Sequence, residues 1–199
     1  MAGENFKGDS WSGDKEKIQQ LIHYTPSDDL VDISDKLSAN KGDSLLLPLP
    51  DEGTHMIIFN SNNSFISIKT ILQVSSTLTD ACTKPTTLPL DIIPEKNPYA
   101  VQAGSKNAVK VRFRVLFQYK PLAGALVKAW YHVPGKAIQL DTLRTDKKGW
   151  ITADRHPGRY MISCVHMDHT PADKEAEWLS YWGSLSFEYS QFFPGRATR

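Results

Sequence analysis

The clearest pattern along the chain is an alternation of apolar and polar residues over positions 109–117. Apolar side chains at the odd positions alternate there with Lys110, Arg112 and Arg114. A period of two predicts a strand with one buried and one solvated face. Apolar runs bounded by Gly, Pro and other turn residues predict further strands at 124–132, 138–144, 150–153, 160–167 and 180–189.

The first half of the chain shows a weaker version of the same pattern. Short runs rich in Val, Ile, Phe and Thr predict strands at 29–33, 44–49, 54–60 and 65–74. Residues 14–24 are different, because Ile18, Leu21 and Ile22 have a spacing that fits one face of a helix. A strand over 21–25 is the competing interpretation of that short stretch.

A proline-rich segment separates the two halves. Pro85, Pro89, Pro94 and Pro98 fall within residues 78–98, and proline cannot donate to a strand ladder, so an extended edge strand or a linker is expected. We place a domain boundary there. The predicted fold is all-β, with two β-sandwich modules of Ig-like or prealbumin-like type at residues 1–93 and 94–199.

The composition argues against several classes of function. The 199 residues carry 23 Lys and Arg against 22 Asp and Glu, a net charge of +1, which provides no electrostatic argument for nucleic acid or an anionic membrane as partner. The apolar runs are shorter than the ~20 residues that a transmembrane helix needs. The N-terminus has neither the basic segment nor the apolar segment of a signal peptide. The sequence starts as though the true beginning of the chain lay upstream.

The sequence contains no recognisable catalytic motif, so we expect no enzyme. A Gly-x-Ser-x-Gly nucleophile motif and Gly-rich phosphate loops are both missing. The acidic pairs Asp28-Asp29 and Asp51-Glu52 lie in predicted turns, which explains them without catalysis. Cys82 and Cys164 form no Cys-x-x-Cys pair, and either a disulfide or two separate buried thiols fits them.

Several ordered strings together resemble one known family. They include GENFKG at 3–8, LPLP at 47–50, EGTHM at 52–56, LPLDIIP at 88–94, KPLAGALVKAW at 120–130, VHM at 165–167 and WLSYWGSLSF at 178–187. The chain resembles the bacterial domain-of-unknown-function 4198 family, a nickel-uptake-like periplasmic component. The resemblance implies an exported, periplasmic protein whose C-terminal half is like the transthyretin or carboxypeptidase-regulatory β-sandwich.

Two departures from the family pattern are visible. Family members usually begin with a signal peptide and an upstream strand pair, often opening on a histidine, so the N-terminal module here is expected to be incomplete. Members also have a longer loop between the strand that ends at Ile66 and the strand that begins at Ser67. In this chain the two segments are joined directly. We therefore expect a missing loop, and a chain break, near Ile66 and Ser67.

Four residues are candidate metal ligands. His166, Asp168 and His169 provide two imidazoles and a carboxylate near a predicted strand end, a set that suits nickel, cobalt, copper or zinc. On a strand, however, His166 and His169 point to opposite faces unless the chain turns at Asp168. His55 lies on a strand that the resemblance covers. Hydrogen-bonded or solvated histidines are the favoured explanation of all of these positions. His23, His132 and His156 lie in polar or turn contexts and are expected to be ordinary surface residues.

Two functional hypotheses remain. The first is an exported binding or accessory protein in nickel or cobalt handling, with a metal ion or an envelope or transport protein as partner. The alternative is a structural module without metal that docks a protein or glycan through sheet edges and exposed aromatic residues. Trp178, Tyr181 and Trp182 are candidates for such a surface, although strand alternation places Tyr181 on the face opposite Trp182.

Overall fold

The all-β prediction is confirmed. The computed structural model describes residues 18–36, 47–61, 65–100, 110–132, 135–154, 158–169 and 177–189. These residues form strands and turns, together with the short 3-10 turns η2 (Ser34–Lys36), η3 (Ala81–Thr83) and η4 (Pro98–Ala100). Within them, no helix is long and apolar enough to cross a membrane.

The larger sheet of the described residues has eight strands in the order β2-β1-β3-β4-β12-β11-β8-β9. Its strands are β1 (Ile18–Tyr24), β2 (Leu30–Asp32), β3 (Gly53–Ser61), β4 (Ile66–Val74), β8 (Leu126–His132), β9 (Gln139–Arg144), β11 (Gly158–His169) and β12 (Trp178–Tyr189). Every pair is antiparallel except β4 and β12, which run parallel. Strands from both ends of the chain therefore meet in the middle of this sheet.

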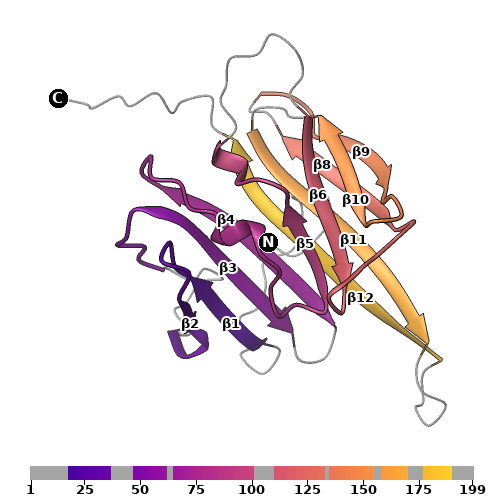
Figure 1. Ribbon diagram of the computed structural model, residues 1–199, viewed down its shortest axis with the longest axis horizontal. Helices are drawn as coiled ribbons and strands as arrows, with labels where there is room; N and C mark the ends of the chain where they lie inside the picture. The colour runs from indigo at the N-terminus through magenta and orange to yellow at the C-terminus, as the bar shows by residue number, and fades with distance from the viewer. Residues whose placement is uncertain are drawn as a thin grey trace.

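The smaller sheet covers one face of the larger one. Its order is β10-β6-β5, with β7 also paired to β6. Its strands are β5 (Leu90–Pro94), β6 (Lys110–Phe117), β7 (Lys120–Pro121) and β10 (Trp150–Asp154). Figure 1 shows β5 and β6 lying across β11 and β12, and β5 contacts β12 directly. The two sheets form a β-sandwich.

The core consists of the inward-facing side chains of both sheets. Phe113 of β6 stacks on Phe187 of β12 with ring centroids 5.9 Å apart, and Tyr160 of β11 stacks on the same ring at 5.2 Å. The predicted alternation of β6 is confirmed, because Val111, Phe113 and Val115 are buried while Lys110 and Arg112 are exposed. Apolar burial of this kind is the main stabilising contribution to folding.

Most of the predicted strands are confirmed, with two corrections. Residues 18–24 form β1 and not a helix, because their backbone groups pair with β2 and β3. The strand predicted at 44–49 is not found at 47–49, and positions 44–46 lie outside the described residues. Ile66 and Ser67 are consecutive residues of β4, with no break between them.

The proline-rich segment contributes an edge strand to the core. β5 is the outer strand of the smaller sheet, and all five of its residues are buried. The edge position suits Pro94, which has no N–H to donate. The larger sheet takes four strands from each side of residue 94, while the division into two modules at 93 and 94 stays a prediction.

Both cysteines are free and buried. Burial is the main cause that raises the pKa of Cys82 to about 12, and it raises the pKa of Cys164 to about 11. At neutral pH both groups are therefore thiols, which pack as small apolar side chains.

Gly183 allows the two sheets to approach each other closely. A Cβ at this position of β12 would lie 2.9 Å from Leu90 Cγ and 3.0 Å from Leu90 O in β5. We expect Gly183→Ala to lower the free energy of unfolding by about 1–3 kcal/mol, the usual cost of overpacking a core. Urea denaturation measures this change. Ser184→Ala, on the opposite face of β12, is the control and should remain close to the wild type.

Candidate functional site

The structure separates the predicted metal ligands of β11. This strand stays paired with β12 through Asp168 and His169, so the chain does not turn at Asp168. His166 faces the interior, where its ring lies 4.3 Å from that of Phe117. His169 faces solvent on the other side of the strand and lies against Trp178 with ring centroids 3.6 Å apart. The two imidazoles therefore do not converge.

His55 lies on β3 and has a different histidine as its neighbour. It is 0% exposed, and the rings of His23 and His55 stack at 5.1 Å. His23 Nε2 is 2.8 Å from His55 Nδ1, while His55 Nε2 is 2.9 Å from the carbonyl oxygen of Asp51. The expectation that His23 is an ordinary surface residue is wrong, because it is only 7% exposed.

The contact with the Asp51 carbonyl fixes the position of one proton on His55. The Asp51 carbonyl only accepts, so His55 Nε2 must donate to it. In the neutral ring, His55 Nδ1 is then an acceptor, and His23 Nε2 donates to it. Protonation of both rings would place two N–H groups and two positive charges face to face. This contact therefore requires at least one neutral ring.

His55, His166, Asp168 and His169 do not fit a single metal ion as a set. Structural and catalytic sites for nickel, copper or zinc use three or more protein ligands around one ion. In the part of the chain that the structure describes, no three His, Cys, Asp or Glu residues are grouped in that way. The histidines belong to three separate environments: the His23 stack, the Phe117 contact and the Trp178 contact.

The C-terminal end of β11 and the N-terminal end of β12 form a two-stranded ribbon, which we define as residues 165–169 and 178–181. β8 pairs with β11 only over 159–164, and β4 pairs with β12 only over 182–186. Beyond those points, each ribbon strand pairs only with the other among the described strands. Figure 1 shows β11 and β12 extending past the rest of the sandwich at the lower right.

The outer face of this ribbon and its root carries four exposed apolar side chains, together with Ser180 and His169. Trp182 pairs with Val165, and Met167 follows on the same face two residues further along β11. Val165, Met167, Trp178 and Trp182 are between 41% and 55% exposed. Tyr181 points the other way and is buried, as strand alternation predicted. We call these four side chains the ribbon face.

The inner side of the ribbon packs on aromatic residues that hold it in place. Tyr181 contacts Phe117 with ring centroids 4.9 Å apart and Phe65 at 4.8 Å. Phe117 also contacts His166. A two-stranded ribbon is at best marginally stable alone, so these contacts explain how the ribbon face is presented on a rigid base.

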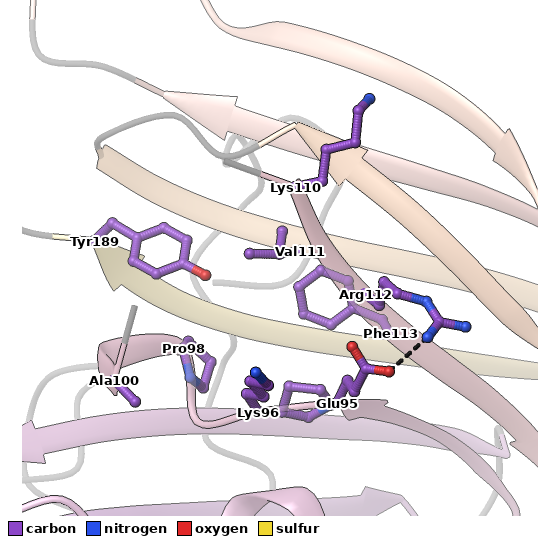
Figure 2. Close-up of a pocket in the computed structure, with 10 residues that line it drawn as sticks. Glu95, Lys96, Pro98, Ala100, Lys110, Val111, Arg112, Phe113 and Tyr189 are labelled. Carbon is purple, nitrogen blue, oxygen red and sulfur yellow. Dashed lines mark hydrogen bonds and ion pairs between the residues drawn. The ribbon is translucent and has the colours of Figure 1, made fainter. Parts of the chain in front are cut away.

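A hollow of about 280 Å³ opens at the opposite end of the sandwich, between η4, β6 and the end of β12. Its charged residues are largely paired, because Arg112 bonds Glu95 at 2.6 Å and Lys110 bonds Asp154 at 3.1 Å. Figure 2 shows the Arg112 pair at the rim and the Tyr189 ring across from it. Among the described residues that line the hollow there is no Ser, Cys or His.

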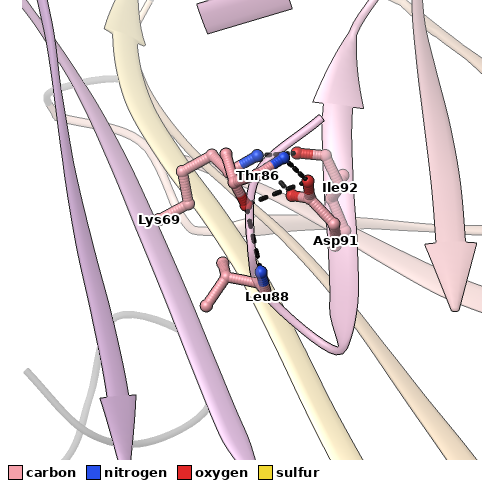
Figure 3. A network of polar contacts seen from close by, with 5 residues as sticks. All are labelled: Lys69, Thr86, Leu88, Asp91 and Ile92. Carbon is pink, nitrogen blue, oxygen red and sulfur yellow. Dashed lines mark hydrogen bonds and ion pairs between the residues drawn. The ribbon is translucent and has the colours of Figure 1, made fainter. Parts of the chain in front are cut away.

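One buried ion pair was not expected from the sequence. Lys69 of β4 bonds Asp91 of β5, and the residues are 1% and 2% exposed. Figure 3 shows that Thr86 also bonds the carboxylate. The signal in the sequence was Lys69 itself, a charge at an inward position of an apolar strand, but its partner 22 residues away could not be identified from spacing.

Comparison with known proteins identifies the family. Residues 32–168 match the model of the family described as Domain of unknown function (DUF4198), which is more than half of the chain, so the chain belongs to this family. No curated protein and no solved structure matches the chain.

The buried and the exposed histidine can be distinguished by how their removal changes the stability of the protein. We expect His55→Ala to lower the free energy of unfolding by about 2–4 kcal/mol, because it empties a buried ring site and removes two hydrogen bonds. His169→Ala, which removes an exposed ring, should change it by at most about 0.5 kcal/mol. Thermal and urea denaturation measure both variants, and an equal effect of the two would contradict the assigned environments.

Proposed function

We propose that this member of the DUF4198 family is a non-enzymatic binding module of the cell envelope that docks a partner protein on its ribbon face. The observation that supports this proposal is the exposure of two tryptophans, a methionine and a valine together on a ribbon that extends beyond the sandwich. Location outside the cytoplasm belongs to the proposal as well, and is supported by the family resemblance of the sequence strings.

Exposed apolar side chains that stand next to each other favour an interface. Single exposed apolar residues are normal on protein surfaces, but a contiguous group of large ones is unfavourable in water and marks interaction sites. Trp and Met are also enriched at protein interfaces, where Trp supplies much of the binding energy. The ribbon face combines both residue types with Val165 in a single patch.

The backbone of the ribbon adds a second mode of contact. Residues 165–169 have no neighbouring strand on the β8 side among the described residues. An open strand edge can pair with an extended segment of a partner through main-chain hydrogen bonds. A protein partner can therefore use both the apolar face and the edge of the same ribbon.

A glycan is the less favoured occupant of this face. Carbohydrate sites combine flat aromatic rings with polar groups that bond hydroxyls. Here Val165 and Met167 accompany the tryptophans and offer no such bonds, while His169 on the same face lies against Trp178. The indole N–H of Trp182 already bonds Ser180 Oγ at 3.3 Å. An apolar protein surface suits this face better.

The test is affinity capture with matched variants of the full chain. Wild-type protein and a Trp178→Ser, Trp182→Ser variant are used as baits in envelope extract from the source organism. The partner enriched by the wild type is then purified and titrated against both. We expect at least about tenfold weaker binding by the variant, since loss of an interface tryptophan typically costs 2 kcal/mol or more.

A Lys128→Ala variant, changed at a polar position outside the ribbon, is the control and should bind like the wild type. Equal binding by the double tryptophan variant would overturn the proposed docking face. Binding of a purified oligosaccharide, and of no protein, would replace the protein partner with a glycan.

Transition-metal handling is a second candidate, supported by the family resemblance of the sequence strings. The adjoining imidazoles of His23 and His55 would hold the ion after giving up the hydrogen bond between them. Two imidazoles can provide half of a four-coordinate site. Calorimetry of the full chain with nickel, cobalt, copper and zinc tests it. We expect uptake of one of these ions that His55→Gln abolishes and His169→Gln leaves unchanged. Absence of uptake by the wild type, or uptake that His55→Gln does not alter, would eliminate this candidate.

A further inference from the structure

Lys69 and Asp91 face each other across the interior of the sandwich. Lys69 projects inward from β4 of the larger sheet, and Asp91 lies on β5 of the smaller sheet. The residues are 1% and 2% exposed, so bulk water does not reach the contact. Lys69 Nζ donates to Asp91 Oδ1, which brings the amine next to the side-chain carboxyl carbon (Figure 3).

The surrounding contacts orient both groups. Lys69 Nζ also donates to the carbonyl oxygen of Ile92 at 3.2 Å. The other carboxyl oxygen, Asp91 Oδ2, accepts from the backbone N–H of Thr86 at 2.8 Å and from Thr86 Oγ1 at 3.0 Å. Thus one carboxyl oxygen lies against the amine, and the other is held by two donors.

Burial makes the charged form of this pair costly. Desolvation is the main cause that lowers the pKa of Lys69, with the Asp91 charge opposing it. Transfer of one proton from Nζ to Oδ1 yields a neutral amine and a neutral carboxylic acid without any outside reagent. These are the two partners of amide formation, and burial keeps away the bulk water that would reverse the reaction.

We propose that Lys69 and Asp91 condense to an isopeptide bond that links β4 to β5. The lone pair of Lys69 Nζ attacks Asp91 Cγ and forms the C–N bond. The Cγ–Oδ1 bond then breaks, and Oδ1 leaves as water with two of the three protons that Nζ carried. One proton remains on the amide nitrogen, so atoms and charge balance, and the chain loses one water molecule.

Thr86 supplies the stabilisation that this step requires. Negative charge develops on Oδ2 in the tetrahedral intermediate, where the Thr86 N–H and hydroxyl already point. Two fixed donors of this kind act as an oxyanion hole. The Ile92 carbonyl accepts one amine hydrogen and so helps to hold the nitrogen against the carboxyl group.

An exposed pair of the same residue types provides a matched comparison. Lys84 bonds Asp28 at the surface, where the two side chains are 60% and 42% exposed. Water solvates both charges there, so the ion pair is the stable form. The interior position, and not the pairing of Lys with Asp, is what favours condensation.

The deciding measurement is the intact mass of the full-length chain, denatured after prolonged incubation in the folded state. We expect a mass lower than the sequence mass by one water molecule, and a proteolytic peptide pair joined through Lys69 and Asp91. A full sequence mass overturns the proposal, and so does a water loss located at other residues, including Lys84 and Asp28.

Two variants test the assigned roles. Lys69→Arg should restore the full sequence mass, because the guanidinium is not a nucleophile at neutral pH. Thr86→Val keeps the backbone donor and removes the hydroxyl, so a larger fraction of unlinked chains is expected after the same incubation. An unchanged linked fraction in Thr86→Val would overturn the role of the hydroxyl, and persistence of the link in Lys69→Arg would overturn the site.

Discussion

The parallel pairing of β4 with β12 is the contact on which the architecture depends. It joins residues 66–70 to residues 182–186 and so brings distant parts of the chain together in the centre of the larger sheet. Without it, β1 to β4 and the strands β8, β9, β11 and β12 would be two separate sheets with four exposed edges. β5 covers the inner face of this parallel pair.

The close approach of the two sheets follows from the small residue at this position. Gly183 pairs with Ser67, and its bare Cα faces Leu90 of β5. Next to it, Leu185 pairs with Lys69, whose amine reaches across to Asp91. Apolar packing and one polar tie therefore fix the smaller sheet on the larger one within a few residues of the parallel pair.

The strands were predictable from sequence because their signal is local. The alternation over 109–117 and the turn residues around 145–149 report the conformation of their own neighbourhood, and β6 and β10 appear where they were expected. Gly149 adopts a positive φ, and the Asp146 side chain accepts from the N–H groups of Lys148 and Trp150. Turn chemistry of this kind is contained in five consecutive residues.

The candidate site was less predictable, because its contacts join residues that are far apart in the chain. His23 looked like a surface residue among polar neighbours, and only the pairing of β1 with β3 places it beside His55, 32 residues away. The opposite orientation of His166 and His169 was predictable from strand alternation alone. The residues that face these two histidines were not predictable, because Phe117 and Trp178 reach those positions through different strand pairs.

The ribbon face and the buried Lys69 to Asp91 contact are connected through β12. One end of this strand carries Trp178 and Trp182, and its middle pairs with β4 beside Lys69. The pairing of β12 with β4 and that of β11 with β8 both begin at the root of the ribbon. A covalent tie from β4 to β5 would clamp β12 at that root, because β12 contacts both strands. The Lys69 contact lies near this root, because Leu185, the partner of Lys69, follows Trp182 along β12.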